Sequence, residues 1–138
     1  MLKIFNSTLA FLSGLIGFGI LYLLLEAIAQ MTGLDSSFIP VGLILFGPIY
    51  EELGKYFSIK IWKITNPYAI FLGLGWSAIE SFSMYVNKEG INLLYRINPT
   101  LLHILTSVVL VYFITRKKPV RGLIIAIILH IVYNIIFS

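Results

Sequence analysis

Five long runs of apolar residues, separated by short polar connections, divide the chain of 138 residues. A helix needs about 17–25 mostly apolar residues to cross the hydrocarbon core of a bilayer, and each run is close to that length. The pattern therefore predicts an all-α fold: a polytopic membrane helix bundle of about five transmembrane helices, in one domain over residues 1–138. The expected helices cover residues 4–30, 38–62, 67–86, 99–115 and 120–137.

Prolines mark where several of these helices are expected to begin or bend. Asn66-Pro67 and Asn98-Pro99 each place a capping side chain before a proline at the first helical position. Pro48 is different, because it falls inside the run of residues 38–62 and removes a backbone hydrogen bond there. We therefore expect a kink in this helix just before Glu51. The first run resembles a secretory signal, but its apolar core, residues 9–25, is longer than a signal's, so we expect a retained helix.

The composition supports a membrane protein and narrows the chemistry. Hydrophobic residues make up 59% of the chain, and the mean hydropathy is +0.95. There is no cysteine, which excludes disulfides, a thiolate nucleophile and a cysteine-based metal site. The net charge is +4, and the basic residues lie between apolar runs. This placement is typical of membrane topology, so we expect no nucleic-acid partner.

The basic residues are divided unequally between the two sides of the predicted bundle. The connections on the side opposite the N-terminus carry only Lys88 and Arg96. Because cytoplasmic loops are enriched in lysine and arginine, the sequence predicts a cytoplasmic N-terminus and a C-terminus on the outside. The residues on the predicted cytoplasmic side are Lys3, Lys60, Lys63, Arg116, Lys117, Lys118 and Arg121.

The segment Glu51-Glu52-Leu53-Gly54-Lys55 puts three charges into a run that otherwise reads as a membrane-spanning helix. A charge near the bilayer centre costs roughly 2.5–3.5 kcal/mol even on the mildest scale, so such a segment indicates a functional site. Lys55 follows Glu51 by four residues, on the same helix face and in the favourable order for an ion pair. We therefore expect Lys55 to neutralise Glu51.

Six polar residues from four different runs are expected to lie at a similar depth in the membrane. At about 1.5 Å of rise per residue, they lie roughly 13–21 Å from the cytoplasmic ends of their helices. The only two histidines of the chain are among them. Convergence at one depth indicates a shared site rather than scattered structural polar groups. The six residues are Glu51, Glu52, Glu80, His103, His130 and Asn134.

These residue types favour hydrolysis by activated water. A glutamate beside a neutral histidine suits general-base catalysis, and His130 with Asn134, four residues apart, could stabilise an oxyanion. We expect no cofactor, but a zinc ion held by Glu51, His103 and His130 stays open, although no short H-E-x-x-H spacing is present. An aspartyl dyad is excluded, because Asp35 is the only aspartate.

Other features are expected to serve packing. Gly73 and Gly75 suit close contacts between helices, and Trp76 suits packing or an interfacial anchor. In the first run, a small-residue side is expected to pack against a neighbouring helix. It consists of Ser13, Gly14, Gly17 and Gly19.

Four motifs in order along the chain resemble the PrsW family of intramembrane proteases, which is related to the CAAX-prenyl-protease and bacteriocin-processing (CPBP) superfamily. Each motif alone is weakly specific, but four of them on four successive predicted helices are fairly specific. The motifs are Glu51-Glu52-x-x-Lys55, Gly73-x-Gly75-Trp76-x-Ala78-x-Glu80, Arg96-x-x-Pro99-x-x-x-His103-x-x-Thr106 and His130-x-x-x-Asn134.

The resemblance implies a membrane-embedded endopeptidase. Members of the PrsW family act on membrane-anchored anti-sigma factors, and relatives in the superfamily cut prenylated C-termini. By position, Glu51 resembles the catalytic glutamate and His103 the histidine that helps to hold water. His130 and Asn134 resemble the oxyanion-stabilising pair, and Glu52 and Glu80 match acidic positions of the family. Family members are usually longer, so a second copy of this chain could supply a missing wall.

The sequence thus predicts a glutamate-type intramembrane endopeptidase. Its expected partners are the lipid bilayer and a membrane-anchored protein or lipidated peptide as substrate, with a homodimer left open. The alternative is a non-catalytic membrane module, either a component of a proton- or cation-coupled carrier or a scaffold subunit, because buried glutamate and histidine chains also form proton relays.

Overall fold

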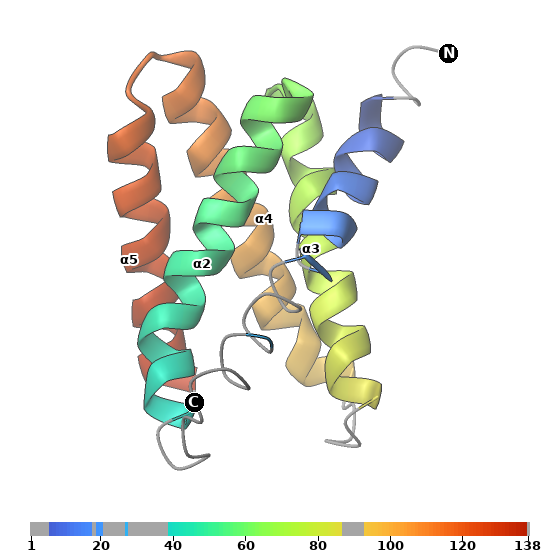
Figure 1. Cartoon of the computed structure of the whole chain (residues 1–138), viewed down its shortest axis with the longest axis vertical. Coiled ribbons are helices and arrows are strands. Elements are labelled where there is room, and N and C mark those ends of the chain that lie inside the picture. Colours follow the sequence, from blue (N-terminus) through green and yellow to red (C-terminus); the bar gives the residue numbers. More distant parts are fainter. Residues whose placement is uncertain (1–5, 18, 21–26, 28–38, 87–92, 138) are drawn as a thin grey trace.

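The computed structural model describes residues 6–17, 19–20, 27, 39–86 and 93–137. The described residues form helices and short connections, with no strand among them, which confirms the all-α fold. An N-terminal helical segment, residues 6–17 and 19–20, precedes four longer helices (Figure 1). These are α2 (Ile39–Trp62), α3 (Asn66–Val86), α4 (Leu93–Thr115) and α5 (Pro119–Phe137).

Three of the predicted helices agree with the structure to within one residue at each end. They are α2, α3 and α5, and α3 begins at Asn66, which confirms a helix start at Asn66-Pro67; the capping role of Asn66 stays a prediction. The helix predicted over residues 4–30 is described only in part, and the rest of it lies outside the described residues. Helix α2 continues through Pro48 without interruption. The kink expected before Glu51 stays a prediction.

The predicted start of the fourth helix at Asn98-Pro99 is wrong. Helix α4 begins six residues before Pro99, at Leu93, and Pro99 lies inside it. Proline removes one backbone N–H and so one helical hydrogen bond, but it does not forbid the turn before it. Leu93 and Leu94, which lie outside the predicted helices, therefore belong to α4.

Glycines let the helices around α3 approach closely. A methyl group added at Gly73 would lie 2.6 Å from the backbone oxygen of His103 on α4. One added at Gly75 would meet the backbone of Phe11 in the N-terminal segment, which lies beside α3 in Figure 1. From the other side, one added at Gly14 would meet the backbone of Leu72 on α3. The packing role predicted for Gly73 and Gly75 is confirmed.

Gly73→Ala is expected to lower the free energy of unfolding by about 1–3 kcal/mol, because the new methyl group meets rigid backbone of α4. The matched control is Gly19→Ala, since a methyl group there has no neighbour within 4 Å among the described residues. Alanine has the better helix propensity, so the control should be neutral or more stable by up to about 1 kcal/mol. Reversible unfolding in mixed micelles measures both variants. Equal stabilities would contradict this account of the α3–α4 contact.

Some charged side chains are buried in the bundle, and many large apolar side chains are exposed. Charged and polar side chains such as Lys55 and His103 are buried, whereas α5 exposes large apolar side chains. Segment Ile97–Thr115 of α4 and the whole of α5 are long and apolar enough to cross a membrane. The exposed large apolar side chains of α5 are Val120, Ile124, Ile125, Ile128, Val132, Ile135, Ile136 and Phe137.

The connections α2–α3 and α4–α5 lie at the same end of the bundle (Figure 1). Both helices end in the same way, with a lysine in the left-handed region: Lys63 has φ 51° and Lys117 has φ 58°. The following N–H groups then bond back to the carbonyls of Ile59 and Phe113, as in a Schellman motif. These two turns present exposed lysines at this end of the molecule.

Candidate functional site

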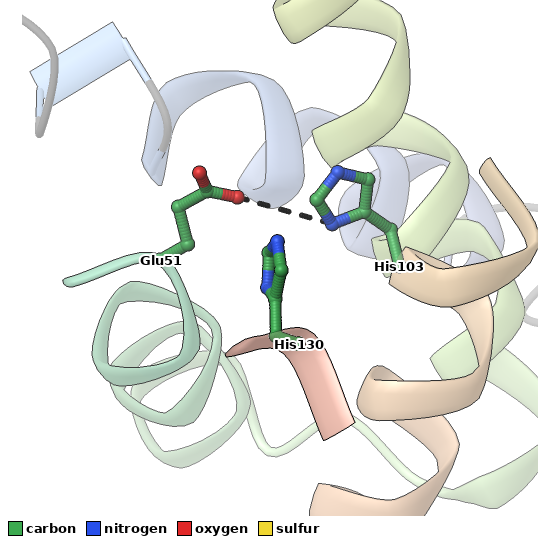
Figure 2. A group of neighbouring side chains, drawn as sticks. All are labelled: Glu51, His103 and His130. Carbon is green, nitrogen blue, oxygen red and sulfur yellow. Dashed lines mark ion pairs between the residues drawn. The ribbon is translucent and has the colours of Figure 1, made fainter. Parts of the chain in front are cut away.

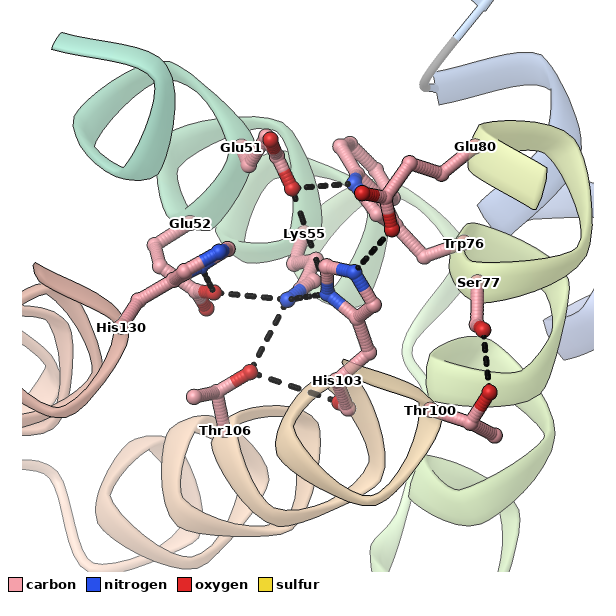
Figure 3. A network of polar contacts seen from close by, with 10 residues as sticks. All are labelled: Glu51, Glu52, Lys55, Trp76, Ser77, Glu80, Thr100, His103, Thr106 and His130. Atoms are coloured by element: carbon pink, nitrogen blue, oxygen red, sulfur yellow. Dashed lines mark hydrogen bonds and ion pairs between the residues drawn. The ribbon is translucent and has the colours of Figure 1, made fainter. Parts of the chain in front are cut away.

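Polar side chains from all four labelled helices meet inside the bundle (Figure 3). Five of the six residues predicted to share one depth belong to this group, because hydrogen bonds, some of them through Lys55 and Trp76, link them across the helices. The group consists of Glu51, Glu52 and Lys55 from α2, Trp76 and Glu80 from α3, His103 and Thr106 from α4, and His130 from α5.

Lys55 is fully buried at the centre of this group. Its ammonium nitrogen lies 2.6 Å from Oε1 of Glu52, 2.9 Å from Nδ1 of His103 and 2.9 Å from Oγ1 of Thr106. A lysine ammonium has three N–H donors and no acceptor, so these three contacts use its whole capacity. Lys55 thereby ties α2 to α4.

The predicted pairing of Lys55 with Glu51 is wrong, because the ammonium pairs with Glu52. Both spacings, three and four residues, place two side chains on one helix face, so spacing alone does not choose between them. The side chains of Glu52 and Lys55 are both fully buried, whereas 18% of the Glu51 side chain is exposed. The ammonium therefore neutralises the carboxylate that water does not reach.

The contacts of His103 fix its tautomer. Lys55 donates to Nδ1, so Nδ1 carries the lone pair of the ring and the ring proton is on Nε2. Nε2 lies 2.8 Å from Oε2 of Glu80 and donates to it. His103 is thus held in place on both sides, by an ammonium from α2 and a carboxylate from α3.

His130 is oriented by Glu52. Its Nδ1 lies 2.8 Å from Oε1 of Glu52 and donates to it, which leaves the lone pair of the neutral ring on Nε2. The ring packs edge-on against His103, with centroids 5.3 Å apart. Oε1 of Glu52 thus accepts from both Lys55 and His130, while Oε2 is buried with no hydrogen-bond partner among the described residues.

Glu51 is held by a tryptophan. Nε1 of Trp76 donates to Oε2 of Glu51 at 3.1 Å, and the same oxygen lies 3.9 Å from Nδ1 of His103, too far for a hydrogen bond. The expectation of packing or an interfacial anchor for Trp76 was incomplete, since its indole is also a donor to the site. A sequence signal existed: Trp76 and Glu80 are four residues apart, on one face of α3.

The indole of Trp76 is fully buried in a space that two glycines create. A methyl group added at Gly54 would lie 2.5 Å from Cη2 of the indole, and one at Gly17 would lie 2.9 Å from Cζ3. Gly54 lies between Glu51 and Lys55 in α2. Because it has no side chain, it leaves room for the indole that donates a hydrogen bond to Glu51. A larger residue at Gly54 would displace the indole.

Trp76→Phe is expected to lower the free energy of unfolding by about 1.5–3 kcal/mol, because it deletes a hydrogen bond to a charged group. Trp62→Phe is the control, since Trp62 is 46% exposed and should tolerate the change. To separate the hydrogen bond from packing, Trp76→Phe is repeated in a Glu51→Leu background. Unfolding titrations should give a coupling above about 0.5 kcal/mol between the two positions. Strictly additive effects of the two substitutions on the free energy of unfolding would contradict the hydrogen bond between Trp76 and Glu51.

Glu51, His103 and His130 form a compact triad (Figure 2), whose potential metal-binding atoms lie within 4.8 Å of one another. These are the residues that the sequence analysis named for a zinc ion. Each imidazole is oriented by a carboxylate on its other nitrogen, as is usual for metal-binding histidines. The triad could also act without metal, with the Glu51 carboxylate as a base beside two neutral rings.

Asn134 lies on α5, one turn after His130, and is half-buried. The oxyanion role expected for the two residues stays a prediction. Comparison of the chain with protein-family models, with curated proteins and with solved structures gave no match. The resemblance to the PrsW family therefore rests on the four sequence motifs.

Proposed function

We propose that the chain is an intramembrane endopeptidase that hydrolyses a peptide bond of a membrane-anchored substrate with water activated by Glu51. One observation carries the proposal: Glu51 is the partly exposed carboxylate beside two oriented imidazoles, inside a bundle that exposes many large apolar side chains. The neighbouring carboxylate, Glu52, is sealed and neutralised by Lys55. The two adjacent glutamates thus have different environments and suit different tasks.

A five-span topology fits the same proposal. The apolar exposed faces would contact lipid, and the charged residues of α2 would be shielded by its neighbours, as charges in membranes usually are. The connections that carry Lys63 and Lys117 lie at one end of the bundle, which is consistent with a cytoplasmic N-terminus. The substrate would then be a membrane-anchored protein or a lipidated peptide, reached within the bilayer.

In the proposed reaction, Glu51 takes a proton from water while the water oxygen attacks the carbonyl carbon of the scissile bond. Trp76 holds one oxygen of the carboxylate, which leaves the other to accept the proton. Collapse of the tetrahedral intermediate breaks the C–N bond, and protonated Glu51 returns the proton to the leaving amine. No covalent link to the enzyme is formed, and one water is consumed for each bond cut.

To donate to the oxyanion, the neutral ring of His130 would first have to gain a proton on Nε2. In the neutral ring, Nδ1–H is engaged by Glu52, and Nε2 has no proton to donate. The imidazolium form donates from both nitrogens, with the Glu52 carboxylate as its counter-ion, so Nε2–H can bind the oxyanion. Asn134, on the same helix face, would supply the second donor. Glu52 is then a positioning residue.

A second candidate function is a proton-coupled, non-catalytic module. A continuous chain of hydrogen bonds runs across the bundle from His130 through Glu52, Lys55 and His103 to Glu80, as a proton relay would need. Glu51 is not a link in that chain. A relay therefore predicts that Glu52 and Glu80 are essential and Glu51 is dispensable, whereas a peptidase requires Glu51.

Cleavage profiling tests the proposal. Wild-type protein and Glu51→Gln, both checked for folding, are reconstituted in liposomes with a library of single-span and lipidated peptides. Products are identified by mass spectrometry. Fragments that appear only with wild type would support the peptidase, and their ends would define the cleavage site. A folded wild type that cuts nothing in the library, or cuts no better than Glu51→Gln, would count against it.

A further inference from the structure

The lone pair that a metal ion would need is occupied by Lys55. Of the two nitrogens of His103, Nε2 carries the proton donated to Glu80, so only Nδ1 can bind a metal ion. Nδ1 is also the nitrogen that faces Glu51. The ammonium of Lys55 already lies 2.9 Å from it and donates a hydrogen bond into that lone pair.

The rest of the triad is arranged as in a metal site. Two histidines and a glutamate are a ligand set of catalytic zinc sites, which leave a further position open for water. The carboxylates of Glu80 and Glu52 orient the two rings in the way that metal-binding histidines usually require. As a set of zinc ligands, the triad therefore lacks only a free lone pair on Nδ1 of His103.

We propose that Lys55 acts as a built-in cation of the Glu51–His103–His130 triad. Its ammonium excludes a divalent metal ion from the wild-type protein, and removal of Lys55 creates a zinc site. A zinc ion bound to Nδ1 would lie about 2.1 Å from it, in the space that the ammonium fills. One lone pair cannot serve both cations, and a unit charge and a double charge in contact repel strongly in a buried site. The inference rests on the geometry of the site and not on the proposed hydrolysis.

The test is a zinc titration of the full chain in detergent micelles, purified through a tag without histidine. Calorimetry measures the affinity for Zn²⁺, and the absorption spectrum of Co²⁺ reports nitrogen and oxygen ligands in a tetrahedral site. Wild type is compared with Lys55→Met. The matched control is Lys60→Met, because Lys60 is an exposed lysine on the same helix. His103→Ala, made alone and together with Lys55→Met, checks that the triad binds the ion.

Lys55→Met leaves the Glu52 carboxylate without its ammonium, so folding could fail. The double variant Lys55→Met with Glu52→Gln avoids this problem, since the glutamine side chain is neutral and its amide oxygen can still accept from Nδ1–H of His130. Both Lys55 variants are expected to bind one Zn²⁺ at least about a hundredfold more tightly than wild type and Lys60→Met. The gain should disappear with His103→Ala.

Two results would overturn the proposal. Wild type could bind one Zn²⁺ as tightly as the Lys55 variants and lose it with His103→Ala, which would mean that Lys55 excludes nothing. Alternatively, the folded double variant could bind no more Zn²⁺ than Lys60→Met, which would mean that the triad is no metal site. Neither measurement uses cleavage, so a failure here is distinguishable from a failure of the proposed function.

Discussion

Glu51→Gln is expected to reduce the cleavage rate by about a hundredfold to ten-thousandfold, the usual contribution of a positioned general base. Glutamine keeps the size of the side chain and an oxygen that can accept from Trp76, so the fold and the contact at Nε1 should survive. What is lost is the carboxylate that takes the proton from water. Because binding of the substrate does not depend on that proton transfer, kcat should fall and KM should change little.

The neighbouring position provides the matched control. Glu52→Gln makes the same chemical change one residue further along α2, where the carboxylate neutralises Lys55 and orients His130. We expect it to lower the free energy of unfolding, which Glu51→Gln should leave nearly unchanged. Kinetics and unfolding titrations on both variants separate the two roles. A fully active Glu51→Gln would remove Glu51 from the mechanism and favour the relay of Glu52, Lys55 and Glu80.

Lys55→Met is expected to lower the free energy of unfolding by about 3–5 kcal/mol, the usual cost of removing one partner of a buried ion pair. The ammonium is fully buried and satisfies three acceptors on two helices. Without it, the Glu52 carboxylate stays buried with only His130 as a donor, and its Oε2 already lacks a partner among the described residues. Lys60→Met, at an exposed lysine of the same helix, should change stability by less than about 0.5 kcal/mol.

A double-mutant cycle tests the cause of that loss. If the destabilisation comes from the uncompensated charge of Glu52, then Glu52→Gln should recover a large part of it in the Lys55→Met background. Unfolding titrations in mixed micelles give the four free energies that the cycle needs. Additive costs would contradict the pairing of Lys55 with Glu52. A change in Lys55→Met no larger than in Lys60→Met would do the same.

The convergence of the site was predictable from the sequence because it depends on a fixed quantity. The rise per residue of an α-helix is constant, so the depth of a residue follows from its position along its apolar run. This estimate predicts that Glu80, His103 and His130 lie at a depth similar to that of Glu51. The bounds of α2, α3 and α5 followed from apolar length and from signals such as Asn66-Pro67. Both are local properties of the chain.

The contacts within the site depend on tertiary packing and were not predictable. Glu51 and Glu52 are both within reach of Lys55 along the helix. The two acceptors on α4, His103 and Thr106, fix where the ammonium lies and so determine which glutamate it pairs with. The role of Trp76 as a donor depends on Gly54, whose missing side chain makes room for the indole. Sequence spacing does not report such a fit between two helices.

Cleavage in heavy-oxygen water tests the central claim most directly, namely that Glu51 activates the water that hydrolyses the peptide bond. Wild type and Glu51→Gln, reconstituted in the same liposomes, are given the substrate found by profiling. Mass spectrometry then measures the mass of the fragment that carries the new carboxyl terminus. We predict that wild type produces a fragment that carries heavy oxygen in that carboxylate and that Glu51→Gln produces almost none. Labelled fragment formed equally fast by folded Glu51→Gln, or fragment formed without label, would contradict the account.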